Sequence, residues 1–307
     1  MIEKFRSALR AAAMGTLVLA VSGCSIKRMA INSLGSAVAS GSSSTFATDD
    51  DAELIRDAIP FALKTIESLI EQSPKHRDLL TAAASGFTQY GFAFIQQDAD
   101  FAEAQDLDRA TQMRTRAKKL YLRAAEYGLR GLDVGHPGFR GQLATAPDAA
   151  LAGTSKRDVP LLYWTAAAWA AALAIDVNDS DLAVRQAAIE KMMQRALVLD
   201  ETWGKGAVHD FFIAWEAGHA SAGGSMVKAR EHFARSVLLS DGQLVSPFVS
   251  LAESVAISEN NKKEFESLLK QALAIDLSKA PDQKLVNVIN QRRARWLLGR
   301  IDDLFVN

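Results

Sequence analysis

Apolar and polar positions along this chain follow the period of an α-helix almost throughout. Residues 158–200 carry the clearest pattern, because their apolar residues recur three and four positions apart. These positions are Leu161, Trp164, Ala168, Ala171, Ala172 and Ile175, and then Leu182, Ile189, Met192, Met193, Ala196, Leu197 and Leu199. The first set ends near Asp176, and the run 177–181 separates it from the second. Asp158 precedes Pro160 in the way that a helix cap precedes a first turn. The pattern predicts two antiparallel helices joined by a short turn.

Similar patterns predict further helices on both sides of this pair. We expect them over about 49–73, 76–97, 100–135, 205–217, 225–240, 246–258 and 261–276, and from about 283 onward. Asp50 with Glu53, Asp100 with Glu103, and Asn261 with Glu264 have the spacing of capping boxes. Pro60 should kink or split the first of these helices. Because alternating β-branched runs are almost absent, the sequence predicts an all-α protein.

Residues 136–156 interrupt the helical pattern. They contain three glycines and two prolines and have no sustained period. A segment this long inside a helical array is either a disordered insertion or a lid. Phe139 and Leu143 favour a segment that packs as a cover over a cleft.

A short motif recurs in the second half of the chain. ALVLD at 196–200 is followed by SVLLS at 236–240 and by ALAID at 272–276, so the steps are 40 and 36 residues. Such endings are typical of the second helix of tetratricopeptide repeats, whose period is about 34 residues. The motif predicts degenerate tetratricopeptide-like helical repeats in an α-α superhelix, with an ordinary α-bundle as the alternative.

The N-terminal region has the pattern of a secretory signal. A basic start is followed by an apolar run from Ala11 to Val21, which is too short to span a bilayer comfortably. The sequence then reads Val-Ser-Gly-Cys and resembles the lipobox of bacterial lipoproteins, which predicts lipidation of Cys24. The alternative is a plain secreted protein with a free thiol. We therefore expect a signal peptide at 1–23, a lipidated flexible tether at 24–48 and a helical-repeat domain at 49–307.

Composition and motifs argue against several functions. The 307 residues carry a net charge of −1, without the basic excess of a nucleic-acid-binding protein. His209 and Glu216 share a helix face, but a zinc site needs more ligands than these two. Gly223 and Gly224 before a helix could bind an anion, although a turn and cap is the simpler interpretation. No catalytic constellation, metal site or cofactor motif is evident, so we expect no enzyme.

Aromatic side chains are the best candidates for a ligand site. Trp164 and Trp169 lie on one predicted helix, and His209, Phe212 and Trp215 lie on another. In a repeat array, successive helices line a concave surface, so these five residues are candidate ligand contacts in an apolar cleft. Packing in the hydrophobic core is the alternative for each of them. Arg114, Arg116, Arg293 and Arg295 fit solvated faces or contact with an anionic ligand.

Five stretches of the chain together resemble the T-component family of tripartite ATP-independent periplasmic (TRAP) transporters. They are residues 60–94, 158–175, 195–218, 223–239 and 291–305, including DVPLLYWTAAAWAAALAI and QRRARWLLGRIDDLF. They occur in the order of the family and cover most of the expected domain.

This resemblance implies a lipoprotein of tetratricopeptide-like repeats that assembles as a homotrimer. It also implies association with a TRAP-type periplasmic substrate-binding protein and a small hydrophobic or organic-acid ligand in an apolar cleft or channel. Ser25 follows the lipidated cysteine where aspartate would favour the inner membrane, so we expect the periplasmic side of the outer membrane. The alternative function is an envelope scaffold lipoprotein that uses its repeat surface for protein–protein interaction without a ligand.

Overall fold

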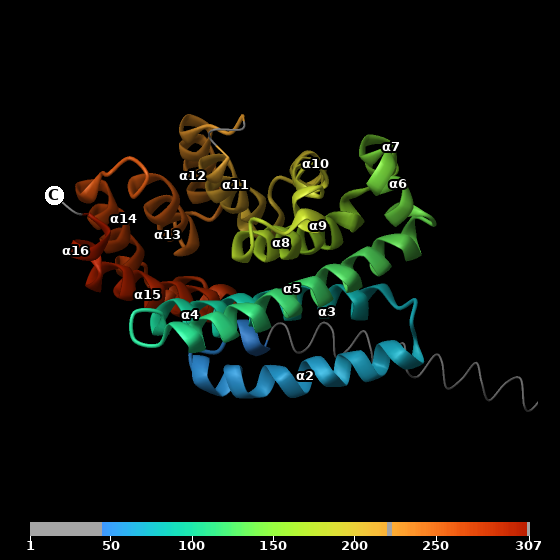
Figure 1. Cartoon of the computed structure of the whole chain (residues 1–307), viewed down its shortest axis with the longest axis horizontal. Helices are drawn as coiled ribbons and strands as arrows, with labels where there is room; N and C mark the ends of the chain where they lie inside the picture. The colour runs from blue at the N-terminus through green and yellow to red at the C-terminus, as the bar shows by residue number, and fades with distance from the viewer. Residues whose placement is uncertain (1–44, 220–222, 306–307) are drawn as a thin grey trace, which may run out of the picture.

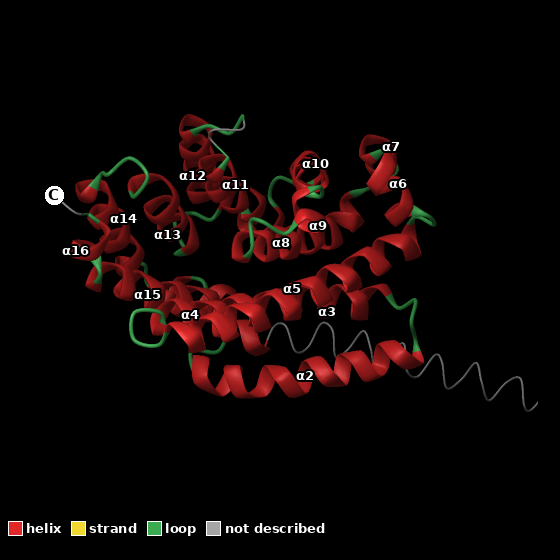
Figure 2. Cartoon of the chain, in the orientation of Figure 1, coloured by secondary structure: helices red, strands yellow, loops and turns green. Residues whose placement is uncertain are grey.

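The computed structural model describes residues 45–219 and 223–305, all of them in helices, turns and connecting loops (Figures 1 and 2). The signal peptide, Cys24 and most of the tether lie outside the described residues. The main helices in the first half are α2 (Ala52–Gln72), α3 (Arg77–Tyr90), α4 (Gln97–Ala102), α5 (Leu107–Gly135), α6 (Phe139–Thr145), α7 (Pro147–Ala152) and α8 (Val159–Ile175). Those in the second half are α9 (Ser180–Ala183), α10 (Gln186–Leu199), α11 (Ala207–Gly218), α12 (Met226–Leu239), α13 (Ser246–Leu251), α14 (Lys262–Ala274), α15 (Lys284–Gly299) and α16 (Ile301–Leu304). The prediction of an all-α protein is confirmed.

Two segments of π-helix occur within longer helical runs. Gly91–Gln96 joins α3 to α4 without a break, and Ala252–Ala256 continues α13. The third predicted helix begins later than expected. α4 ends at Ala102, and α5 begins at Leu107, where the carboxylate of Asp106 accepts from the backbone N–H of Arg109 at 2.9 Å. The prediction of a capping box at Asp100 was therefore wrong, since Asp100 lies inside α4.

Of three further caps expected from the sequence, one is confirmed, one moves to the neighbouring residue and one is not formed. Asp51, one residue after Asp50, caps α2 by accepting from the N–H of Leu54 at 3.0 Å. α2 is continuous through Pro60 and is therefore not split. Asn261 caps α14 as expected, with its side-chain oxygen 3.1 Å from the N–H of Glu264. Asp158 precedes α8 but does not cap it, because its carboxylate binds Ser155 and Arg77 instead.

The segment 136–156 is ordered and helical. It forms α6 and α7, and Phe139 and Leu143 are 1% and 3% exposed within the main hydrophobic cluster. The expectation of an irregular segment was wrong, because two helices of six or seven residues are too short to show a clear period.

α5 and α8 approach each other closely. A Cβ placed on Gly128 would lie 2.0 Å from Oγ1 of Thr165, so only glycine allows this approach. The segment Lys156–Ile175, which contains α8, is long and apolar enough to cross a membrane. However, 56% of its most apolar 18-residue stretch is buried inside the molecule, where α8 packs against α3, α5 and α10 as a core helix does.

The buried residues form two hydrophobic clusters that meet within α11. Phe212 belongs to the first cluster, to which α2, α3 and α5 to α10 contribute, and Ile213 belongs to the second, to which α12 to α16 contribute. α15 also contacts both clusters, since Ile289 packs in the first and Leu297 in the second. The C-terminal half therefore packs against the N-terminal half mainly through α11 and α15.

The three recurring motifs occupy matching positions in the fold. Each lies at the end of a helix, in α10, α12 and α14. Their first residues, Ala196, Ser236 and Ala272, are fully buried. Two positions further on, Val198 and Leu238 are 77% and 63% exposed. The motif thus marks one helix face in three separate helices.

A candidate ligand cavity between α2, α3 and α15

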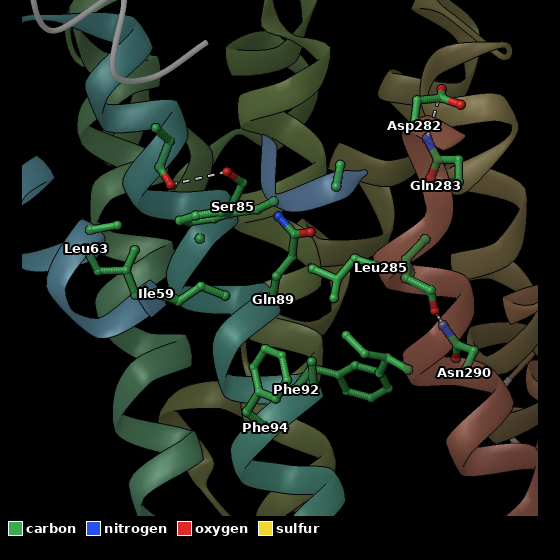
Figure 3. A pocket seen from close by; sticks show the side chains of 18 of the residues that line it. Ile59, Leu63, Ser85, Gln89, Phe92, Phe94, Asp282, Gln283, Leu285 and Asn290 are labelled. Carbon is green, nitrogen blue, oxygen red and sulfur yellow. Dashed lines mark hydrogen bonds between the residues drawn. The ribbon is translucent and has the colours of Figure 1, made fainter. Parts of the chain in front are cut away.

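A cavity of about 370 Å³ lies between the N-terminal helices and α15 (Figure 3). One wall is formed by α2, α3 and the π-helical segment Gly91–Gln96, and the opposite wall by α15 and the turn before it. The lining residues are Phe46, Ala47, Ile59, Ala62, Leu63, Ile66, Ala82, Ser85, Gly86, Gln89, Phe92, Ala93, Phe94, Asp282, Gln283, Leu285, Val286, Ile289 and Asn290. The cavity therefore joins residues that are about 200 positions apart in the sequence.

Small side chains on the N-terminal wall leave room for this cavity. Ala62, Ala82 and Ala93 line it, and Gly86 allows α2 and α3 to approach each other. A Cβ on Gly86 would lie only 2.7 Å from Cδ2 of Leu63. Phe46, within the described end of the predicted tether, closes part of the same wall.

Few polar groups face the cavity, and none of them is a lysine or arginine. Ser85 uses its hydroxyl to bind the carbonyl of Ala82 at 3.2 Å. Asn290 is 6% exposed and donates from Nδ2 to the carbonyl of Val286 at 2.8 Å. Its side-chain oxygen makes no hydrogen bond within the described part of the chain. Asn290 can therefore accept one hydrogen bond from a bound molecule without losing a contact.

A π-helix contributes Phe92, Ala93 and Phe94 to the cavity wall. The wider turn changes which side chains face α15, and such segments are frequent at functional sites. Tyr121 of α5 packs against this π-helical segment and holds it in position. A Cβ on Gly91 would lie 2.8 Å from the ring of Tyr121, whose hydroxyl donates to Oε1 of Gln96 at 2.6 Å.

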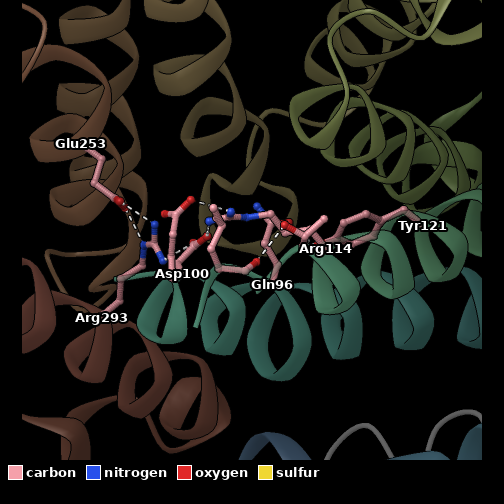
Figure 4. A network of polar contacts seen from close by, with 9 residues as sticks. Gln96, Asp100, Arg114, Tyr121, Glu253 and Arg293 are labelled. Atoms are coloured by element: carbon pink, nitrogen blue, oxygen red, sulfur yellow. Dashed lines mark hydrogen bonds and ion pairs between the residues drawn. The ribbon is translucent and has the colours of Figure 1, made fainter. Parts of the chain in front are cut away.

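Ion pairs hold α15 against the N-terminal wall. Arg293 binds Asp100 of α4 at 3.1 Å and Glu253 at 2.6 Å (Figure 4). Arg292, its neighbour, binds Asp98 at 3.2 Å. The side chains of Arg293 and Asp100 are 13% and 17% exposed, so water screens this pair only partly. These pairs join α15 to α4, the helix that follows the π-helical segment of the N-terminal wall.

Comparison with known proteins decides the family. The family model described as "TRAP transporter T-component" matches residues 48–305, which is most of the chain. This chain belongs to the TRAP transporter T-component family. A protein from Treponema pallidum (strain Nichols), described as uncharacterized, is 31% identical over 307 residues, covering 94% of this chain and 95% of its own. The resemblance inferred from the five stretches is confirmed, and the chain is a transporter component of the cell envelope.

None of the seven residues predicted to contact a ligand lines the cavity of this T-component. Trp169 and Phe212 are 5% and 3% exposed, in the same buried cluster as Phe139 and Leu143. The guanidinium of Arg185 covers the ring of Trp169 at 4.8 Å. These four side chains pack in the core.

Trp164 and Trp215 are partly exposed and belong to two aromatic groups. Trp164 contacts the rings of Tyr163 and Trp203, with centroids 4.9 and 6.2 Å away. Trp215 stacks on Phe211 at 5.5 Å and on His219 at 4.1 Å. The structure therefore separates the predicted aromatic set into neighbouring groups along α8 and α11.

His209 is buried in a polar cluster where α11 meets α12. Its Nδ1 lies 2.7 Å from Nδ1 of His232, and its Nε2 lies 3.1 Å from Oε1 of Glu201. Hydrogen bonds from Arg235 hold the pKa of Glu201 at about 2, so this carboxylate only accepts. His209 must then carry a proton on Nε2 and accept at Nδ1 from His232. Within the described residues, no group of three potential ligands is arranged to hold a metal ion.

The cavity residues were missed by sequence analysis. Ala83, Ala84, Gly86 and Gly91 mark a small-residue face, and Phe92 and Phe94 supply bulk beside it. That pattern predicts close helix packing, and nothing in it indicates that α15 leaves part of the face uncovered.

Proposed function

We propose that this T-component associates with a TRAP-type substrate-binding protein and holds or passes a small hydrophobic ligand during solute transport. The cavity between α2, α3 and α15 is the observation that carries this proposal. Its volume of about 370 Å³ suits a small organic molecule, and most of its lining is apolar.

The lining favours a neutral ligand over an organic acid. A carboxylate in this cavity would meet no lysine or arginine in the lining, and the charged lining residue Asp282 already pairs with Lys205 at 3.1 Å. A neutral molecule could place one donor on the free oxygen of Asn290 and its apolar part against Ile289 and Phe94. Of the two ligand classes expected from the resemblance, the hydrophobic class fits better.

The family suggests how this function is placed in the cell. Lipidation at Cys24 would anchor the chain at the periplasmic side of the outer membrane, because several acyl chains together hold a protein stably. The remaining tether would let the domain reach a soluble substrate-binding protein. Assembly as a homotrimer belongs to the same proposal.

The second candidate function is an envelope scaffold without a ligand. It is favoured by the burial of Trp169, Phe212, Phe139 and Leu143, which fill the space where the sequence suggested a cleft. A scaffold would bind partners whether or not the cavity were open.

Complex formation between the purified proteins tests the first function. The full chain, purified in detergent, is mixed with the TRAP-type substrate-binding protein of the same organism, and their complex is measured by size-exclusion chromatography. We expect a stable complex whose formation changes when the binding protein is loaded with solute. Failure of the two proteins to associate, with or without solute, would contradict the proposal.

A further inference from the structure

One exposed face of α5 carries a row of basic side chains that the cavity does not use. Arg109, Arg116, Arg123 and Arg130 follow one another at intervals of seven residues, and Lys119 lies between the middle two. We call these five residues the basic ridge. Seven residues span about 10 Å of helix, so the ridge is about 30 Å long. All five are exposed except Arg130, which is half-buried.

Most of the ridge has no acidic partner. Within the described residues, the only ion pair made by the ridge joins Arg123 to Glu67 at 3.6 Å. By contrast, Arg114 and Lys118 on the neighbouring faces of α5 each bind two carboxylates. Four basic side chains without an ion pair in the described part of the chain, Arg109, Arg116, Lys119 and Arg130, therefore lie in one row on a single helix.

Aromatic rings hold three of the guanidinium groups in place. Arg116 lies over Tyr90 at 6.0 Å, Arg123 over Phe87 at 5.3 Å, and Arg130 over Tyr127 at 5.3 Å. A guanidinium stacked on a ring keeps its edge N–H groups free for a carboxylate, and it loses less conformational freedom when it binds one. The ridge therefore presents ordered donors that suit bidentate contact.

We propose that the basic ridge is a docking surface for an acidic protein face with aspartate or glutamate side chains about 10 Å apart. An anionic membrane fits less well, because Asp108 is exposed beside Arg109 and a flat surface would also meet this carboxylate. A protein can place its acids along a line and avoid it. The inference rests on the proposed function, since the partner to be tested is the TRAP-type substrate-binding protein.

The experiment reverses the charge of the ridge and of a matched surface. The test variant is R116E/K119E/R123E in the full chain, and the control is K228E/K263E/K279E, whose exposed lysines lie in and after α12 and α14. Both variants change the net charge equally. Affinity for the substrate-binding protein is measured at 0.1 M and 0.5 M salt, after thermal melts establish that each variant is folded. If the test variant does not fold, R116Q/K119Q/R123Q replaces it.

We expect the test variant to bind at least about tenfold more weakly at 0.1 M salt, with the difference shrinking at 0.5 M because salt screens exposed charges. The control should stay within about twofold of the wild type. Equal loss in both variants, or no loss in the test variant, would overturn the ridge while leaving the partnership intact. If the wild type does not bind at all, the proposed function fails and the inference falls with it.

A membrane role is tested with vesicles. Binding to phosphatidylglycerol–phosphatidylethanolamine vesicles is compared with binding to phosphatidylcholine vesicles for the wild type and the test variant. We expect no difference that depends on the ridge. A preference for anionic vesicles that R116E/K119E/R123E removes, with unchanged affinity for the substrate-binding protein, would assign the ridge to the membrane instead.

Discussion

At the scale of single residues, the pair His209 and His232 shows how burial sets a protonation state. Their nitrogens are 2.7 Å apart, so only one proton fits between them. Burial lowers the pKa of His232 to about 4, and the neighbouring His209 adds to this effect. Burial also lowers the pKa of His209, despite its contact with Glu201. The sequence placed His209 on a helix. Its contact with His232 could not be predicted, because it depends on how α11 packs against α12.

This pair predicts a loss of stability in acid. His232 binds a proton more readily when the chain is unfolded, so its contribution is complete above pH 6.5 and disappears as the pH falls toward 4. We expect the free energy of unfolding to decrease by about 2 kcal/mol over this interval, which is less than the full shift would give because His232 is only half-buried and water screens its charge. In H232N, the amide can still donate to His209, and the decrease should become smaller. Urea unfolding at several pH values measures the free energy of unfolding of the wild type and of H232N. Identical pH profiles for the two would contradict the role of His232.

At the scale of helices, glycines inside α5 decide how closely α8 can pack. Gly128 and Gly131 face Thr165 and Leu161, with no room for a Cβ at either position. Glycine is unfavourable within a helix, yet both positions lie inside the helix predicted to end at 135. α5 does continue to Gly135, since the gain from packing exceeds the helix propensity that is lost. The local pattern of apolar residues predicted the helices, whereas tertiary contacts determine where each helix begins and ends.

G128A tests this contact. The added methyl group would overlap Thr165, so α5 and α8 must separate, and we expect a loss of about 2–3 kcal/mol. G141A is the matched control, because nothing lies within 4 Å of its Cβ position in α6. It should be neutral or stabilise by up to about 1 kcal/mol. Chemical denaturation compares them, and equal stability of the two variants would contradict the close approach.

At the scale of the whole molecule, the N-terminal and C-terminal halves meet across the cavity. The sequence predicted the all-α class and the family from its helical patterns. The cavity could not be predicted in the same way, because its walls come from Ala82 and Ala93 on one side and Leu285 and Ile289 on the other. Only the position of α15 brings them together. The predicted aromatic residues instead fill space within each half.

The ion pair of Arg293 should stabilise this junction. R293M would leave Asp100 and Glu253 without their shared cation in a partly buried position, and we expect a loss of about 3 kcal/mol. R295M is the control, since Arg295 is exposed on the same helix. The free energy of unfolding in urea should hardly change for R295M. Similar losses of stability in R293M and R295M would show that the ion pairs of Arg293 do not stabilise the junction.

The most direct measurement is native mass spectrometry of the full chain with and without a blocked cavity. A82W places an indole in the cavity, whereas A149W places one on an exposed position of α7. We expect the wild type and A149W to retain a small neutral molecule, and A82W to lose it while remaining folded. A cavity that retains no such molecule in the wild type, or one retained equally by A82W, would contradict the account.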